Sequence, residues 1–425
     1  MPSPSSSRLG LDARTAVVLS SGGAKGAYGL GVMRALFSGA AASTGGQPID
    51  PGILTGTSIG AYNASYLTSR DGSAAAALES LIQIWRQRIA QTPLSCGNGF
   101  ARIRGLPFQG LDLGCMMRPW QVAANMAEDA LAFSRDAADW AVAFARASGP
   151  VETRLIDTFD LSNFVDPSPL YRLVASTLDR NGLARSHRKL GIVASRWRDG
   201  TPRLFDRAEL AARGDFKPVL ASMAIPGVLP EVSVDGEWYV DGALTVPTPL
   251  KPAIQDGADV LHVVYVDPLL VETRVSPNAG TFETMMRVFN ILSAERVKSD
   301  IEFAALVNRG IELLDGLFVD GASDTELLAA VGRLPEIFSR LRSGAPRRLL
   351  TIHRYRPGPE MGQASDYLNF TLSSIDRMIE LGYRDAVGHD CDENECILAG
   401  GASAARLDGR GARARAPLAR GWSVQ

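Results

Sequence analysis

The chain has 425 residues, of which 46% are hydrophobic, and its 44 basic and 46 acidic side chains give a formal net charge of −2. This composition is typical of a globular protein with a large core, and the balanced charge argues against nucleic acid as a partner. Because no stretch approaches the roughly 18 uninterrupted apolar residues of a spanning helix, the sequence predicts no membrane-spanning segment.

The N-terminus and the cysteine content bear on location. Residues 1–13 are rich in Ser and Pro and lack the basic-then-apolar pattern of a signal peptide, so we expect a disordered lead-in without an export signal. Four cysteines in a chain of this length do not make the disulfide framework of a small secreted protein, which fits a reducing compartment. We therefore expect a cytoplasmic protein.

Apolar runs and glycine-rich breaks alternate near the N-terminus. A short strand is predicted over 15–19, followed by a glycine-rich loop and a helix over 26–37. A second strand is predicted over 53–55 and a helix over 61–67. Strands that alternate with helices predict an α/β fold, with a mostly parallel sheet covered on both faces.

The middle of the chain has a different character. Residues from about 85 to 150 are rich in Ala and aromatic side chains, and Pro119 suits the first turn of a helix that ends near Arg146. This helical insertion is a candidate lid or membrane-facing element, and core packing of one helical face is the alternative. Further strands are predicted over 189–194, 258–266 and 348–353, and further helices over 281–316, 324–342 and 373–382.

The C-terminal residues 387–425 are dominated by Gly, Ala, Ser and Arg and predict a disordered tail. Residues 401–425 hold five arginines and one acid, so this basic end would be attracted weakly to anionic lipid surfaces. His389, Cys391 and Cys396 also lie in the tail. Three soft ligands are fewer than the four of a structural zinc site, so we assign no metal.

A serine follows the second strand in the sequence Gly56-Thr57-Ser58-Ile59-Gly60. This pattern between a strand and a helix predicts a nucleophile elbow, in which the glycines leave room for a sharp turn. Ser58 would then stand at a helix N-terminus, where free N–H groups, including that of Ile59, favour developing negative charge. The alternative is a tight turn with an ordinary serine.

A second glycine-rich loop, Ser21-Gly22-Gly23-Ala24-Lys25-Gly26, follows the first strand. A dinucleotide-binding loop would need Gly in place of Ser21 and an acidic residue about 20 positions later, and both are missing. An oxyanion hole fits better, with the N–H groups of Gly23 and Ala24 as donors and Lys25 adding positive potential. A flexible turn remains the simplest alternative.

A catalytic serine needs a base, and the chain has only four histidines. His262 and His353 lie in or at the end of predicted strands, where histidine is usually structural. Asp241 is followed by the small residues Gly242 and Ala243, so it can approach another loop closely. A buried carboxylate can accept a serine proton because burial raises its basicity, although Asp-Gly is also a common turn.

These elements, in this order, resemble the patatin-like phospholipase family. The resemblance implies a three-layer α/β/α fold with a mostly parallel central sheet, in a catalytic domain over residues 14–386. It also implies a catalytic dyad of Ser58 and Asp241, with residues 22–26 as the oxyanion hole and neither metal nor cofactor in the reaction. The matching segments are LSSGGAKGAYGLGVM (19–33), TGTSIGAYN (55–63), ASMAIPGVLP (221–230), VDGALTVPTP (240–249) and LSSIDRMIELGYRDA (372–386).

The resemblance implies a serine lipid acyl hydrolase that cleaves carboxylic esters of phospholipids or related acyl esters, with peripheral membrane contact as a further expectation. Ser21 replaces the first glycine of the family's loop, and Pro247 stands where the family has asparagine. Two alternatives remain. One is a Ser-His-Asp esterase that uses His353 or His262. The other is a catalytically weak, lipid-binding effector of the same fold, which the two departures motivate.

Overall fold

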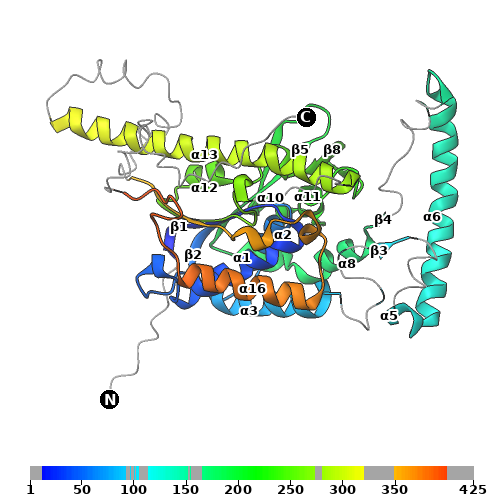
Figure 1. Ribbon diagram of the computed structural model, residues 1–425, viewed down its shortest axis with the longest axis horizontal. Helices are drawn as coiled ribbons and strands as arrows, with labels where there is room; N and C mark the ends of the chain where they lie inside the picture. Colours follow the sequence, from blue (N-terminus) through cyan, green and yellow to red (C-terminus); the bar gives the residue numbers. More distant parts are fainter. Residues whose placement is uncertain are drawn as a thin grey trace, which may run out of the picture.

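An eight-stranded mixed sheet forms the centre of the molecule (Figure 1). The computed structural model describes residues 12–91, 96, 100, 102–104, 113–151, 154, 165–272, 280–319 and 349–399. The strands of the sheet are β1 (Asp12–Leu19), β2 (Pro51–Thr57), β5 (Lys189–Arg196), β6 (Pro202–Asp206), β7 (Val232–Val234), β8 (Glu237–Asp241), β9 (Val260–Val264) and β10 (Thr351–Tyr355).

The strand order is β10-β9-β1-β2-β5-β8-β7, and β6 pairs with β5. The first five strands of this order pair in parallel, whereas β6, β7 and β8 pair antiparallel. Along β1, Val17 and Leu19 enter one core cluster while Ala16 and Val18 enter the other. The continuous apolar run therefore forms a strand buried on both faces, as its composition predicts.

Helices cover both faces of the sheet, which confirms the three-layer α/β/α architecture. Figure 1 shows α13 on one side of the sheet and α1, α3 and α16 on the other. The larger core cluster lies under α1 (Gly26–Ser38), α2 (Ile59–Thr68), α3 (Ala74–Ile84), α8 (Ser168–Thr177), α9 (Arg180–Arg185), α10 (Arg207–Ala212), α11 (Lys217–Ser222) and α16 (Leu372–Val387). The smaller cluster lies under α12 (Leu250–Gln255) and α13 (Thr281–Val319).

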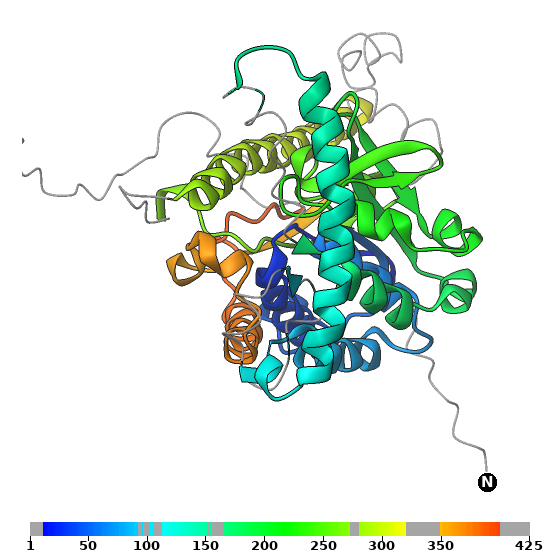
Figure 2. The ribbon, with the colours of Figure 1, turned by 90° about the vertical axis from the view of Figure 1, so that its right-hand side faces the viewer.

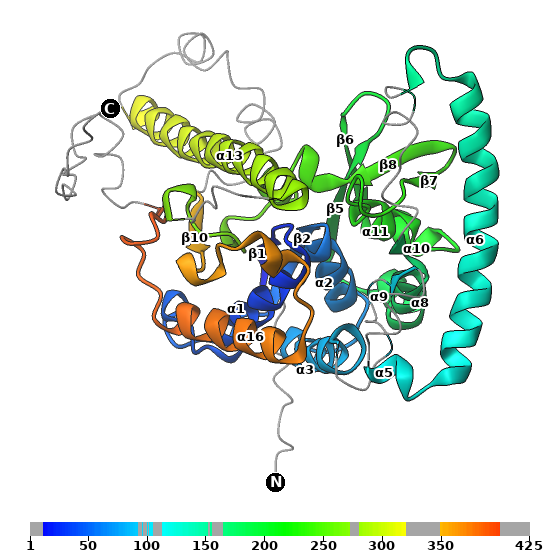
Figure 3. The same cartoon turned by 45° about the vertical axis from the view of Figure 1, so that its right-hand side comes forward.

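The insertion contains α5 (Leu113–Met116) and the long helix α6 (Pro119–Arg146), whose bounds match the prediction. Figures 1 and 3 show α6 standing apart from the body, and Figure 2 places it in front of the body. Trp120 is 71% exposed and Trp140 is 40% exposed, so these aromatic side chains do not form the core-packing face that the alternative required.

Two linkages join parts of the insertion to each other, and one of them also reaches β4. Arg102 of β3 (Arg102–Ile103) is buried between Asp129 of α6 and Asp166 of β4 (Val165–Asp166), with Nη–Oδ2 distances of 3.0 Å to each. A disulfide joins Cys96 to Cys115 of α5. The sequence did not predict this bond, because four cysteines in a long chain do not form a spacing pattern that indicates a disulfide.

The chain ends differ from the sequence-based boundaries. β1 begins at Asp12, inside the predicted lead-in, and residues 1–11 lie outside the described part. The predicted tail is wrong for residues 387–399, because Val387 belongs to α16, Ile397 pairs with Ile352 of β10 and Cys396 is buried. The predicted helix over 324–342 and residues 400–425 lie outside the described ranges. Within those ranges, no helix has the length and apolar character needed to cross a membrane.

Candidate active site

A sharp turn at Ser58 joins β2, which ends at Thr57, to α2, which begins at Ile59. Ser58 has φ 57° and ψ −127°, a conformation that a non-glycine residue adopts at a cost of about 1–3 kcal/mol. The turn brings Gly56 against the backbone of Gly60, and a Cβ on Gly56 would lie 2.2 Å from the Gly60 carbonyl oxygen. The glycine spacing thus serves the elbow geometry that the sequence predicted.

Ser222, which sequence reasoning did not single out, holds the turn from the side. The Ser58 N–H donates to Ser222 Oγ at 2.9 Å, and Ser222 Oγ donates to the Val193 carbonyl of β5 at 2.6 Å. The sequence pointed to Ser222 only through its position in the segment ASMAIPGVLP, which carries part of the family resemblance. A relay of two hydrogen bonds therefore anchors the strained turn to the central sheet.

The Ser58 hydroxyl donates to Asp241 Oδ2 at 2.6 Å, and both side chains are buried. These residues are 183 positions apart, but β5 brings their strands together. Val193 of β5 lies opposite Thr57, and the next residue, Ala194, lies opposite Asp241. Because β2 runs parallel and β8 antiparallel to β5, their carboxyl ends converge at this point.

Burial raises the pKa of Asp241 to about 7, against the lowering effect of hydrogen bonds from the Ser58 hydroxyl and the Ala243 N–H. The Ala243 N–H donates to Asp241 Oδ1 at 2.9 Å, and Gly242 and Ala243 form the turn that makes this contact. A carboxyl group with a pKa near neutrality is a much stronger base than an ordinary aspartate, and a base of this strength suits proton transfer at pH 7.

The glycine-rich loop approaches the dyad from the end of β1. Gly22 and Gly23 line the same cavity as Ser58 and Asp241. Gly23 has φ +55°, and a Cβ at this position would lie 2.4 Å from the Tyr367 carbonyl oxygen, so the loop requires glycine there. Ala24, in the same loop, is buried in the core.

Lys25 has a different environment from the one that the sequence suggested. Its ammonium is buried, donates to Asp267 Oδ1 at 2.9 Å and lies 4.1 Å from the centre of the Tyr367 ring. Tyr367 Oη also lies 2.6 Å from Asp267 Oδ2. The ion pair with Asp267 ties Lys25 to the segment after β9, so its ammonium braces the loop. A contribution of Lys25 to the potential at the oxyanion hole stays a prediction.

The two departures from the family pattern contact each other through the main chain. The Ser21 N–H donates to the Pro247 carbonyl at 3.0 Å, and Thr57 Oγ1 donates to the neighbouring Val246 carbonyl at 2.8 Å. These bonds use backbone carbonyls and place no demand on the side chains of Ser21 and Pro247. Next to them, Gly26 packs its backbone against the Ile59 side chain, which brings α1 close to α2.

A mainly apolar cavity of about 120 Å³ lies over the dyad. Its lining side chains include Met285, Met286 and Phe289 of α13, the helix that covers this side of the sheet. A larger groove of about 630 Å³ continues along α13 and shares Ser21 with the cavity. Among the described residues that line the cavity, none comes from the insertion, so α13 occupies the position that sequence reasoning gave to residues 85–150.

The two strand histidines contact other partners. His262 Nδ1 lies 2.9 Å from Tyr355 Oη, and His353 Nδ1 lies 3.5 Å from Cys391 Sγ. The rings of His262 and His353 stack on each other. No histidine of the described chain lines the cavity over Ser58, which removes the geometric basis for a Ser-His-Asp arrangement.

Comparison with known proteins identifies a matching family and a distantly similar solved structure. A family model described as patatin-like phospholipase matches residues 17–254, which is more than half of the chain. No curated protein matches. Among solved structures, the chain is similar to VipD from Legionella pneumophila, with 12% sequence identity and a TM-score of 0.27. The match covers 86% of this chain and 66% of that chain, just under two thirds of its length.

The contact between Lys25 and Asp267 yields a stability prediction. Asp267→Asn leaves a buried ammonium without its counter-charge, so the free energy of unfolding in urea should fall by about 2 kcal/mol. The matched control is Asp235→Asn, which breaks an exposed pair with Arg213 and should cost less than about 1 kcal/mol. Equal effects of the two substitutions would contradict the bracing role of Lys25.

Proposed function

The chain belongs to the patatin-like phospholipase family, and on that premise we propose that it is a serine lipid acyl hydrolase. Its substrates would be phospholipids or related acyl esters, and it would cleave a carboxylic ester bond. The observation that carries the proposal is the buried hydrogen bond of 2.6 Å between Ser58 Oγ and Asp241 Oδ2, at the floor of an apolar cavity.

In the proposed mechanism, Ser58 Oγ attacks the ester carbonyl carbon while Asp241 accepts the hydroxyl proton. Backbone N–H groups of Gly23, Ala24 and Ile59 stabilise the negative charge on the carbonyl oxygen. The tetrahedral intermediate collapses, Asp241 returns the proton to the departing alkoxide, and an acyl-enzyme remains on Ser58. Water, deprotonated by Asp241, then attacks this ester, and Asp241 returns the proton to Ser58 Oγ as the fatty acid leaves.

The shape of the site supports an acyl chain as the group that is bound. Met285, Met286 and Phe289 present flexible or flat apolar surface, and the groove along α13 extends the apolar region away from the dyad. The cavity lining gains free energy from burying methylene groups and provides few polar groups to recognise a small polar ester. The groove beyond it also carries charged side chains, among them Arg354 and Arg356.

A Ser-His-Asp esterase is less well supported, because His262 and His353 are bonded to other groups. A catalytically inactive effector of the same fold can be told from an enzyme by the reactivity of Ser58. A fluorophosphonate probe labels an activated serine, so stoichiometric labelling that disappears in Ser58→Ala would exclude an inactive site.

The dyad assignment predicts that Ser58→Ala and Asp241→Asn each lower kcat/KM for a short p-nitrophenyl ester by at least about 10³-fold. Circular dichroism should show an unchanged fold. His262→Asn is the control for the alternative base and should keep most of the activity. A folded His262→Asn protein without turnover, or a fully active Asp241→Asn protein, would refute the dyad.

The pKa of Asp241 sets a pH dependence. The base must be deprotonated to accept the serine proton, so kcat/KM should rise with pH and level off above an apparent pKa of about 7. An aspartate with an ordinary pKa would be almost fully deprotonated by about pH 5, so kcat/KM would no longer rise above that pH. Stopped assays in buffers of constant ionic strength measure this rise of kcat/KM with pH. A rise whose midpoint lies below pH 5 would contradict a buried carboxylate as the base.

Contact with a lipid surface is proposed through α13. Val288 and Leu292 lie one helical turn apart, at 52% and 61% exposure, next to the groove and cavity over the dyad. Exposed apolar side chains at the mouth of an acyl-binding site provide a route by which a lipid leaves a bilayer without crossing water.

The double substitution Val288→Asp with Leu292→Asp should therefore lower hydrolysis of phospholipid vesicles at least about tenfold, since each buried apolar side chain contributes about 1.5–3 kcal/mol. Hydrolysis of a soluble short ester should be unchanged. Leu131→Asp with Val142→Asp makes the matched change on exposed positions of α6. Loss of vesicle activity in the α6 variant alone would assign lipid contact to the insertion instead.

A further inference from the structure

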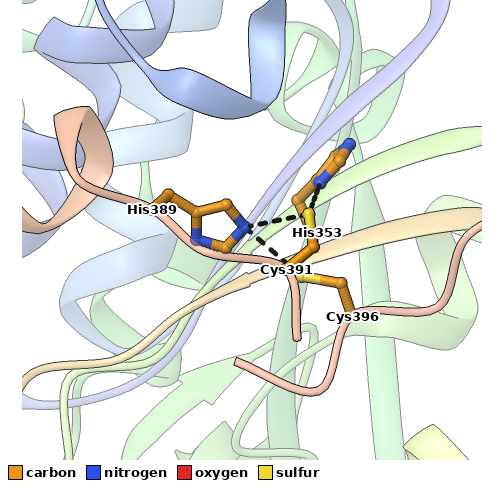
Figure 4. A group of neighbouring side chains, drawn as sticks. All are labelled: His353, His389, Cys391 and Cys396. Carbon is orange, nitrogen blue, oxygen red and sulfur yellow. Dashed lines mark hydrogen bonds between the residues drawn. The ribbon is translucent and has the colours of Figure 1, made fainter. Parts of the chain in front are cut away.

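A cluster of two histidines and two cysteines lies away from the dyad, where the chain returns to β10 after α16 (Figure 4). His353 comes from β10, whereas His389, Cys391 and Cys396 follow the end of α16 at Val387. The four ligand atoms lie within 4.8 Å of one another, and three of the four residues are buried.

The distances between ligand atoms match those of a tetrahedral metal site. Cys391 Sγ lies 3.5 Å from His353 Nδ1 and 3.6 Å from His389 Nε2, and Cys396 Sγ lies 3.3 Å from His389 Nε2. A tetrahedral zinc ion with Zn–S of about 2.3 Å and Zn–N of about 2.0–2.1 Å separates sulfur from nitrogen by about 3.6 Å. Three of the edges of the required tetrahedron are thus already formed.

We propose that His353, His389, Cys391 and Cys396 bind one Zn²⁺ ion as a structural site. Two thiolates and two imidazoles in tetrahedral array favour zinc over the hard cations, which prefer oxygen ligands. Four protein ligands complete the coordination shell and leave no open position for substrate, so the ion would stabilise the fold and take no part in ester cleavage.

The surroundings of the cluster suit bound thiolate and imidazole. The Arg354 N–H points at Cys396 Sγ at 3.4 Å, and such N–H donors stabilise a metal-bound thiolate. His262 stacks against His353, and the Tyr355 ring lies 4.6 Å from His389, so neighbouring rings fix both imidazoles in place. Both cysteines are free thiols in this structure, available as ligands.

The position of the cluster explains what the ion would do. β10 is an edge strand, and the antiparallel bridge between Ile352 and Ile397 covers part of that edge with only two backbone hydrogen bonds, of 2.7 and 3.0 Å. Arg354 adds hydrogen bonds to the carbonyl and carboxylate of Glu395, the latter largely exposed, so the segment gains only modestly from hydrogen bonding. Zinc would cross-link the segment to β10 and hold the C-terminal end of α16 in its place against α1.

The test uses the full chain, purified without chelator and without a metal-binding tag. Inductively coupled plasma mass spectrometry should find one zinc per chain. Cys396→Ser and His389→Asn should each lower the zinc content at least about tenfold, in line with loss of a direct ligand. His187→Asn, which changes an exposed histidine outside the cluster, is the matched control and should keep the full content.

A second measurement does not depend on whether the variants fold. Wild-type protein from which metal has been removed should bind one equivalent of Co²⁺ and develop the visible bands of tetrahedral, thiolate-bound cobalt. The proposal is overturned if wild-type chain, as purified and after dialysis against Zn²⁺, holds no stoichiometric metal. Mass spectrometry that finds a disulfide between Cys391 and Cys396 in freshly purified protein would overturn it as well.

Discussion

The backbone of Ser58 has a positive φ that serine adopts only where its surroundings impose it, and the central strand β5 contributes to that constraint. Val193 of β5 accepts the hydrogen bond of Ser222, which in turn holds the Ser58 N–H. Ser195, two residues further along, donates to the Asp241 carbonyl at 2.9 Å. One strand therefore positions Ser58 through one residue and Asp241 through another, and a shift of β5 would displace both.

The burial that raises the pKa of Asp241, and so suits it to the proposed role of base, also lowers the stability of the fold. The pKa of Asp241 rises from 3.8 to about 7, so the folded chain binds more protons at this site than the unfolded chain between those values. Stability from this group is present at low pH and is lost as pH rises through about 7, by roughly 4 kcal/mol in all. The proposed dyad would be most active in the pH range where the buried Asp241 carboxylate destabilises the fold most. The hydrophobic cores on the two faces of the sheet offset this cost.

Sequence patterns located the parts of the site that depend on neighbouring residues. The elbow at Ser58 and the loop before α1 are strand-turn-helix units, whose glycine spacing is visible within a few positions. Contacts between distant residues leave no such pattern. Ser222 is 164 positions from Ser58, and Asp267 is 242 positions from Lys25. For the same reason, the composition of residues 388–399 predicted disorder: their apolar content is low, and their order comes from contacts with β10.

The two cysteine pairs of the chain are in different chemical states, and their neighbours explain how both can exist in one protein. Cys96 and Cys115 are joined by a disulfide, whereas Cys391 and Cys396 are free and each lies within 3.6 Å of a histidine nitrogen. Conditions that oxidise the first pair would also oxidise a second pair of close thiols unless something engaged the sulfur atoms. A metal ion bound to both sulfurs does so, because thiolate lone pairs that are donated to zinc are less available to attack an oxidant or another sulfur. An oxidised insertion and a reduced C-terminal cluster are thus compatible within one compartment if the cluster holds metal.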